Sequence, residues 1–472
     1  METFCPFAAS GGRVKGRIIR LFHTFNGIKY LAPFFHAWLG RLLQTVFQDI
    51  IPERVHDNRR RGEGCRIMKQ ANDKKQTAAL LALSSIPLIM TLGNSMLIPV
   101  LPSIESALGI TALQSSLIIT VYSVMAIILI PVAGYLSDRI GRKKIIVPSL
   151  ITAAAGGAVC IWAASQNSFG LLLTGRAIQG IGAAGAMPIV LPLVGDMFKD
   201  EERVSSGLGL IETFNTFGKV LSPILGSALA LIAWRTPFWS IPVLCAISIV
   251  LVLWLVKAPR PQLNDKPPSP RTFLKNVWSL YKQKARWLTA LFIVICFTMF
   301  ILFGLLFYLS ETLEKEHHMK GIVKGLVLAI PLAVLCAASF AAGKWIGRRK
   351  QLMKWTVTIG FAVTAAAVAA CLVWDQTAGR IALLSAAGFG IGAGLPCLDA
   401  FVTEGIDKEQ RGSISSFYSS MRFVGVAAGP PVASLLMQQS VSIFFWVMVV
   451  CAFASSLLTL FLIRPNKEPE TA

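Results

Sequence analysis

The chain has 472 residues, of which 54% are hydrophobic and 15% charged, and its mean hydropathy is +0.63. A soluble chain of this length carries about 25% charged residues, so the composition excludes an ordinary water-soluble protein. The formal net charge of +21 would suit a nucleic-acid partner. In a membrane protein such an excess reflects basic loops that face anionic lipid, so we expect membrane lipids and no nucleic acid as partners.

Residues 1–67 form a basic N-terminal extension that precedes the first long apolar segment. Its apolar stretch is interrupted by Arg41 and lacks a small-residue cleavage site, so it is a poor signal peptide. A short polar start, MKQANDKK, begins at Met68. We expect Met68 to be the true start and residues 1–67 to be an over-extended reading frame. The alternative is an amphipathic segment on the membrane surface.

Uncharged segments long enough to cross a bilayer, about 20 residues, recur from residue 77 to the end of the chain. A segment in lipid must satisfy its own backbone hydrogen bonds, so each is expected to cross as a helix. Twelve spans are predicted, at roughly 78–100, 112–136, 145–165, 169–194, 205–231, 236–256, 287–310, 322–346, 352–373, 379–403, 411–437 and 440–463.

A Pro-rich basic segment divides the twelve spans into two sets of six. Lys and Arg gather in the loops after even-numbered spans, which predicts a multi-pass protein of the cell membrane with both termini in the cytoplasm. The predicted domains are the extension (1–67), an N-terminal six-helix bundle (68–256), a cytoplasmic linker (257–286), a C-terminal six-helix bundle (287–463) and a cytoplasmic tail (464–472).

An internal repeat links the two sets of spans. The segment Gly180–Leu229 aligns with Gly388–Leu436 under one offset without a gap. The matched pairs include Gly180 with Gly388, Gly182 with Gly390, Pro188 with Pro396, Arg203 with Arg411 and Pro223 with Pro431. Two six-helix bundles in parallel orientation are the architecture of a transporter that rocks one bundle against the other around a central site.

The loop GYLSDRIGRKKII, from Gly134 to Ile146, resembles the signature loop between helices 2 and 3 of the major facilitator superfamily. The resemblance implies a conformational latch in which Asp138 contacts the positive N-terminal end of helix 11. The latch residues would be Gly134, Asp138, Arg139, Gly141 and Arg142. The alternative is that the basic residues only fix the topology, and both readings can hold together.

The segment LLLTGRAIQGIGAAG, from Leu171 to Gly185, resembles the helix-4 signature of proton-driven members of the same family. The resemblance associates Arg176 with proton coupling. An arginine at membrane depth costs at least ~2.5 kcal/mol, so it needs a partner or a wet cavity. The alternative is a structural arginine held by carbonyl groups of the first helix.

The segment GLIETFNTFGKVLSPILGS, from Gly209 to Ser227, resembles the helix-5 motif of the superfamily's antiporters, which favours export. Small residues replace two expected glycines, so close helix packing is still expected. The motif's packing residues would be Gly209, Gly218, Pro223 and Gly226. The resemblance extends over residues 69–463 and implies an all-α membrane protein, with twelve transmembrane helices in two pseudo-symmetric bundles, of the twelve-helix drug:proton antiporter type.

The same helix carries Glu212 and Lys219, which are seven residues apart and therefore on one face, about 10 Å apart along the axis. A proton-coupled exporter needs a buried acid that takes up and releases a proton. The candidates for proton coupling are Glu212, then Asp399, together with Arg176. The alternative for Glu212 is a structural partner of a cation. Candidates for the cavity and the substrate are Asn94, Asn215, Lys219, Phe300 and Arg422.

The sequence thus favours a proton-coupled exporter of lipophilic small molecules or drugs that works by alternating access, with a small-molecule substrate and protons as partners. The alternative keeps the fold and changes the cargo to one metabolite, siderophore or sugar, or to an anionic lipid-linked sugar. Three buried cations, Arg176, Lys219 and Arg422, suit an anion better than a cation. A non-transporting sensor or scaffold is a third class. The sequence shows no phosphate-binding loop, nucleophile–base pair or metal-ligand spacing, so we expect a protein that is not an enzyme and has no cofactor and no metal. We also expect a monomer.

Overall fold

The computed structural model describes residues 63–198, 201–257, 279, 281–346, 349–404 and 408–463. The contacts described below lie within one unit of the chain, which begins at Ala78. Within the described ranges the regular elements are all helices.

The first half of the chain contains six long helices and two short ones. They are α3 (Glu63–Ser95), η1 (Ile98–Val100), α4 (Leu101–Leu108), α5 (Ala112–Ile140), α6 (Arg142–Ser165), α7 (Phe169–Met197), α8 (Glu201–Ala230) and α9 (Thr236–Leu255). The second half contains α11 (Ala285–Lys315), α12 (Gly321–Ile346), α13 (Lys350–Ala370), α14 (Thr377–Glu404), α15 (Lys408–Gln439) and α16 (Val441–Leu462). By chain order alone, α3 to α9 are called the N-half and α11 to α16 the C-half.

Each predicted span corresponds to one long helix of the described chain, so the expected all-α class with twelve long helices is confirmed. Eleven of these helices are long and apolar enough to cross a membrane by length and composition, within the residues that the structure describes. The remaining one is α8, whose hydropathy is lowered by polar residues such as Asn215 and Lys219. Large apolar side chains such as Trp254, which is 82% exposed, face outward, as expected for surfaces in lipid.

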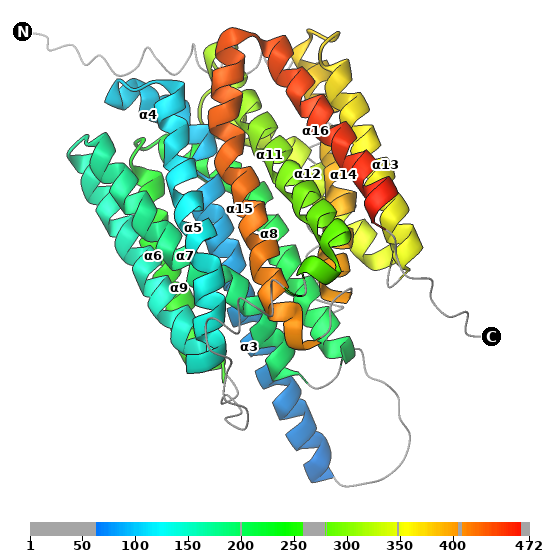
Figure 1. Ribbon diagram of the computed structural model, residues 1–472. Coiled ribbons are helices and arrows are strands. Elements are labelled where there is room, and N and C mark those ends of the chain that lie inside the picture. The colour runs from blue at the N-terminus through cyan, green and yellow to red at the C-terminus, as the bar shows by residue number, and fades with distance from the viewer. Residues whose placement is uncertain are drawn as a thin grey trace, which may run out of the picture. The chain divides into compact units, whose positions relative to one another are not determined.

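Helix packing is extensive within each half, and two helix pairs join the halves. In the N-half, α7 packs against α5 and α6, and α9 packs against α6. In the C-half, α14 packs against α12 and α13, and α16 packs against α13. Between the halves, α5 lies beside α15 and α8 beside α12 (Figure 1). These two pairs make the most extensive contacts between the halves, and η1 of the N-half also contacts α11 and α12.

The repeated glycines explain how the helices of each half approach one another. A Cβ on Gly182 of α7 would collide with the backbone of α6 at Ala153. Its counterpart in the repeat, Gly390 of α14, makes the same close approach to the backbone of α13 at Gly360. Without a hydrophobic force between helices in lipid, such small-residue contacts provide much of the packing energy.

In α8 the four motif residues differ in what they contact. Gly226 lies against the carbonyl group of Met96, and a Cβ on Gly218 would lie 3.2 Å from the carbonyl oxygen of Leu88, so both bring α8 close to α3. The carbonyl group of Pro223 packs against Gly325 of α12 across the halves. Gly209 is exposed, and a Cβ there would meet no described atom within 4 Å, so the packing expected of Gly209 is not seen.

The domain boundaries stay predictions. The N-terminal extension up to residue 62, most of the linker (258–278) and the tail (464–472) lie outside the described residues. The proposed start at Met68 lies inside α3, which begins at Glu63.

Replacing Gly226 with alanine is expected to lower the melting temperature, because the new methyl group would collide with the Met96 carbonyl group. Overpacking of this kind costs about 1–3 kcal/mol. Gly209→Ala in the same helix is the matched control and should be neutral or stabilising by up to about 1 kcal/mol. Thermal unfolding of the purified proteins in detergent measures both. Equal stability of the Gly226→Ala and wild-type proteins would contradict the close contact with α3.

Candidate functional site

Charged side chains from α8, α14 and α15 meet inside the bundle in what we call the central cluster, formed by Glu212, Lys219, Asp399, Tyr418 and Arg422. The Arg422 Nη2 atom lies 3.0 Å from Asp399 Oδ2 and 4.0 Å from Glu212 Oε1. The Tyr418 hydroxyl group donates to Asp399 Oδ1 at 2.7 Å. One arginine of the C-half is thus shared between a carboxylate of its own half and a carboxylate of the N-half.

The two carboxylates of this cluster are held with different strength. Asp399 has a direct ion pair with Arg422 and a tyrosine hydrogen bond. Glu212 is contacted by the Asn215 amide, whose Nδ2 atom donates to both of its oxygens at 3.2 Å, and by Arg422 only at 4.0 Å. Thr91 of α3 donates to Asn215 Oδ1 at 2.5 Å and fixes that amide. Glu212 therefore interacts more weakly with Arg422 than Asp399 does.

The solvent exposure of the charged side chains decreases along α8 from Glu212 to Lys219. The side chain of Glu212 is 24% exposed, whereas Lys219, two turns further, is 7% exposed. The Lys219 charge still interacts with Glu212, Asp399 and Arg422. This arrangement fits the expected polar stripe on one face of α8.

Arg422 keeps unused hydrogen-bonding capacity. Its Nε atom is buried and has no hydrogen-bond partner among the described residues. The guanidinium group also lies over the Tyr418 ring, with 5.5 Å between the Cζ atom and the ring centroid. A buried donor without a partner costs about 1–3 kcal/mol, so an acceptor from a ligand would be favoured at this point.

Arg176 lies in a different environment. Among the described residues, no carboxylate forms an ion pair with it. It is 1% exposed, and its Nε atom donates to the Ile118 carbonyl oxygen at 2.8 Å. Its terminal nitrogens donate to Gln179 Oε1 at 2.5 Å and to Asn94 Oδ1 at 2.6 Å. Its Cζ atom lies 4.5 Å from the Tyr122 ring centroid. Of the two carbonyl groups that accept from Arg176, Ile118 belongs to α5, and only Gly93, at 3.5 Å, belongs to the first helix, α3. The predicted role in proton coupling stays a prediction, and so does the structural alternative.

Two further candidates for the cavity, Asn94 and Phe300, have other contacts. Asn94 is 5% exposed and accepts from Arg176, so it belongs to the arginine's hydrogen-bond set. Phe300 is 9% exposed, and its backbone lies against Gly425 and Gly429 of α15. No described contact links Phe300 to the central cluster, and its role in substrate binding stays a prediction.

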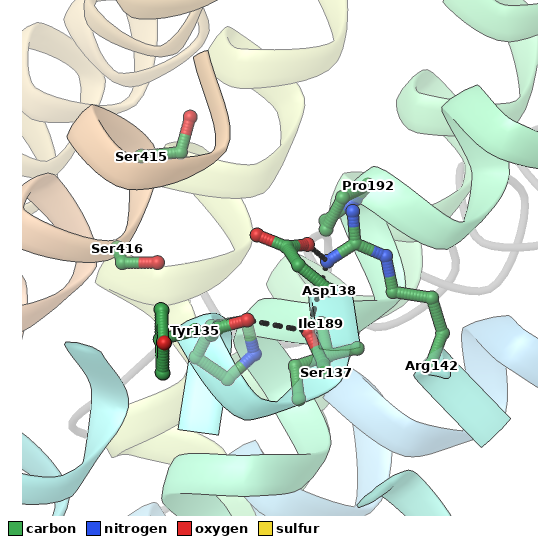
Figure 2. A pocket seen from close by; sticks show the side chains of 10 residues that line it. Tyr135, Ser137, Asp138, Arg142, Ile189, Pro192, Ser415 and Ser416 are labelled. Atoms are coloured by element: carbon green, nitrogen blue, oxygen red, sulfur yellow. Dashed lines mark hydrogen bonds and ion pairs between the residues drawn. The ribbon is translucent and has the colours of Figure 1, made fainter. Parts of the chain in front are cut away.

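The end of α5 and the start of α6 line a pocket together with α7 and α15. Figure 2 shows Asp138 and Arg142 on one side of this pocket and Ser415 and Ser416 of α15 on the other. Asp138 pairs with Arg142, and the Arg142 Nε atom contacts Asp196 of α7 at 3.0 Å. Asp138 therefore faces α15 without an ion pair to it in the described residues.

The other residues of this segment make contacts within the N-half, except Gly134, which packs against α15. Gly141 ends α5 with φ 108°, which glycine adopts without strain. Lys143 donates to the Val256 carbonyl oxygen at 2.7 Å and so caps the end of α9. Gly134 packs against Ser416, and Arg139 lies over the Tyr135 ring at 5.3 Å. The latch function stays a prediction, because side chains at the start of α15 are outside the described set.

A second charged group was missed from the sequence. It lies at the opposite end of α5 from Arg142, which we call the Lys324 end, and it includes Glu105 of α4 and Glu311 of α11. The available signal was Glu311, Glu314 and Lys315 at helical spacing, but the predicted span stopped at residue 310. Within the described residues no group of three His, Cys, Asp or Glu side chains is placed to hold a metal ion.

Comparison with known proteins identifies the fold and the family. The family model of the Major Facilitator Superfamily matches residues 83–430 and 354–472. The chain belongs to the Major Facilitator Superfamily. It is 53% identical over 395 residues to the bacillibactin exporter of Bacillus subtilis (strain 168), which covers 83% of this chain and 98% of that protein. It is 24% identical over 384 residues to the class C tetracycline resistance protein of Escherichia coli, covering 78% and 92% of the two chains.

Among solved structures, the human organic anion transporter MFSD10 (TETRAN) has the same fold, with a TM-score of 0.66 and 19% identity over 81% of this chain and 99% of that chain. The superfamily resemblance and the major facilitator fold are thereby confirmed. The protein is a multi-pass membrane transporter, and the expectation that it is not an enzyme is confirmed by the family and by its named relatives.

A double-mutant cycle on Asp399 and Arg422 is expected to show strong coupling. Arg422→Gln alone leaves the Asp399 carboxylate without its cation, and Asp399→Asn alone leaves Arg422 facing only Glu212. Residues in one ion-pair network couple by about 0.5–3 kcal/mol, so the double variant should be more stable than the sum of the two losses predicts. Unfolding free energies in detergent measure the coupling. Additive losses would mean that the pair does not form in the membrane protein.

Proposed function

We propose that this transporter exports an iron-free siderophore in exchange for protons. The observation that carries the proposal is the 53% identity to a bacillibactin exporter over 98% of that protein's length. This identity favours the siderophore among the cargoes considered from the sequence, ahead of lipophilic drugs. The tetracycline resistance protein is a more distant relative at 24% identity, so it gives the hypothesis of drug export less support.

The chemistry of the central cluster supports such a cargo. A siderophore binds iron through acidic oxygen groups, which keep their protons until the metal displaces them. Oxygen atoms of this kind would accept from the free Nε atom of Arg422 and from Lys219. Their hydroxyl protons would donate to the carboxylate of Glu212. The two carboxylates and two cations of the ionised cluster leave no net negative charge to attract a lipophilic cation.

Competition at Glu212 would couple the cargo to protons. The ionised carboxylate of Glu212 accepts from a hydroxyl donor more strongly than the protonated acid does, so protonation of Glu212 would weaken siderophore binding, and siderophore binding would expel the proton. Glu212 suits this role better than Asp399, because Asp399 is already committed to Arg422 and Tyr418 at 3.0 and 2.7 Å.

The proposed orientation puts the Arg142 end in the cytoplasm and the Lys324 end outside, following the distribution of Lys and Arg among the loops. At the Lys324 end the halves are joined by buried contacts, including Ser310 to the Ile98 carbonyl oxygen at 3.1 Å. The carboxylates of the central cluster are more exposed than those at this end, since the side chains of Glu212 and Asp399 are 24% and 26% exposed and those of Glu105 and Glu311 are 8% and 6% exposed. This conformation would receive cargo from the cytoplasm.

Everted membrane vesicles that contain the full chain are expected to accumulate iron-free bacillibactin when their interior is acidified, and to lose this uptake with a protonophore. Arg422→Gln should raise KM about tenfold or more, because a hydrogen bond to a charged group contributes about 1.5–3 kcal/mol. Arg235→Gln, which removes an exposed cation at the start of α9, is the matched control and should transport normally. Ferric bacillibactin, which lacks the free hydroxyl donors, should be a poor substrate.

Ethidium tests the rival cargo in the same vesicles. Uptake of ethidium without uptake of bacillibactin would overturn the siderophore proposal and restore the drug reading. Uptake of neither compound would reject both.

Glu212→Gln is expected to abolish uptake driven by the proton gradient while retaining exchange of labelled for unlabelled bacillibactin at saturating concentration, with a raised KM because the amide resembles the protonated acid. The amide keeps the shape of the side chain but cannot release a proton, so only steps that move a proton should stop. Measuring both modes in one preparation separates coupling from binding. If Asp399→Asn shows this pattern and Glu212→Gln does not, the proton carrier is Asp399.

A further inference from the structure

A buried set of charges joins the two halves at the Lys324 end, and we call it the end cluster: Glu105, Glu311, Glu314, Lys315 and Lys324. Lys324 of α12 is 1% exposed and donates to the Pro99 carbonyl oxygen and to Glu314 Oε2, both at 2.7 Å. Lys315 of α11 lies 3.2 Å from Glu105 Oε2 and also pairs with Glu311. Each lysine therefore connects a segment of the N-half with the C-half.

The charges of the end cluster do not balance. Three carboxylates face two ammonium groups among the described residues, and Lys324 is engaged by Glu314 and a carbonyl group. Lys315 alone is left for Glu105 and Glu311, which are 8% and 5% exposed. Two buried carboxylates beside one cation leave an uncompensated negative charge, which is costly inside a membrane protein.

The hydrogen bonds of the two carboxylates point to what compensates this charge. Glu105 Oε1 accepts from the Ser115 hydroxyl group of α5 at 2.6 Å, and Glu105 Oε2 faces Lys315. Glu311 Oε2 faces Lys315 as well, but Glu311 Oε1 is buried and has no partner when both groups are treated as acceptors. Both carboxylates contact the same Lys315 Nζ atom, so the two acids lie close to each other. A carboxyl group that carries a proton at this place becomes a donor to its neighbour.

We propose that Glu105 and Glu311 share one proton, and that this second proton site holds the Lys324 end closed. With the proton present, the carboxyl pair carries one negative charge, which Lys315 balances. Loss of the proton leaves two carboxylates, one from each half, which repel each other across the seam between α4 and α11. Lys315 is 54% exposed and offers water a route to the pair. The end therefore closes in acid and opens as the pH rises.

Infrared spectroscopy of the full chain in lipid tests the shared proton directly, because a protonated carboxyl group has a carbonyl band that a carboxylate lacks. The wild-type protein should show a band that disappears as the pH rises, and both Glu105→Gln and Glu311→Gln should lack it. Glu316→Gln, which replaces an exposed acid at the end of α11, should keep the band. Lys315→Gln should keep the band and move its midpoint upward by about one to three pH units, since the balancing cation is gone.

A protonated carboxyl group remote from Lys315 would not shift when this lysine is replaced. A band that is identical in the wild-type, Glu105→Gln and Glu311→Gln proteins would overturn the proposal, and so would an unchanged midpoint in Lys315→Gln.

Thiol labelling tests the closure. Ser310 is 1% exposed under Ile98, so a Ser310→Cys protein should react slowly with a water-soluble maleimide in acid and faster as the pH rises. Its rate is divided by that of Ser106→Cys, an exposed position on α4, which removes the pH dependence of the thiol itself. Adding Glu311→Gln should flatten this ratio. A ratio that rises equally with and without Glu311 would overturn the role in closure. Neither measurement needs a substrate, so both answers are independent of the exported compound.

Discussion

A charged side chain inside a bundle of apolar helices must find its partners in the protein, because the bilayer supplies none. The described structure meets this constraint in two ways. Arg176 takes its partners from α3, α5 and α7, all in the N-half. The central and end clusters take theirs from both halves. Rocking of the halves would leave the first set intact and would have to break or form contacts in the other two.

The central cluster and the end cluster join the two halves with different strength. At the Lys324 end, short contacts from Lys324 and Lys315 close the seam, with the carboxylates nearly buried. At the central cluster, Arg422 reaches the N-half only at 4.0 Å, and the acids stay partly exposed. A ligand or proton that changes the charge of one cluster changes the relative free energy of the two facing states, and thereby acts on the other cluster.

The sequence predicted the twelve helices well because uninterrupted apolar length is a strong local signal. It identified α8 through the repeat and motif spacing, although polar residues lower that helix's hydropathy. Glu212, Asp399 and Arg422 were each identified as buried charges, but their meeting depends on how three helices pack, which one sequence does not encode visibly. Glu311 was missed because acidic residues end an apolar window, whereas the helix itself continues to Lys315.

The charge count of the central cluster limits which cargo can exchange with a proton. Glu212 and Asp399 balance Lys219 and Arg422, so the ionised cluster is neutral. A simple anion would bind best after Glu212 is protonated, and anion and proton would then travel together. Exchange requires a cargo that needs the ionised carboxylate, which means a hydroxyl donor that also presents oxygen acceptors to Arg422. A protonated chelator meets both conditions, whereas its metal complex has lost the donors.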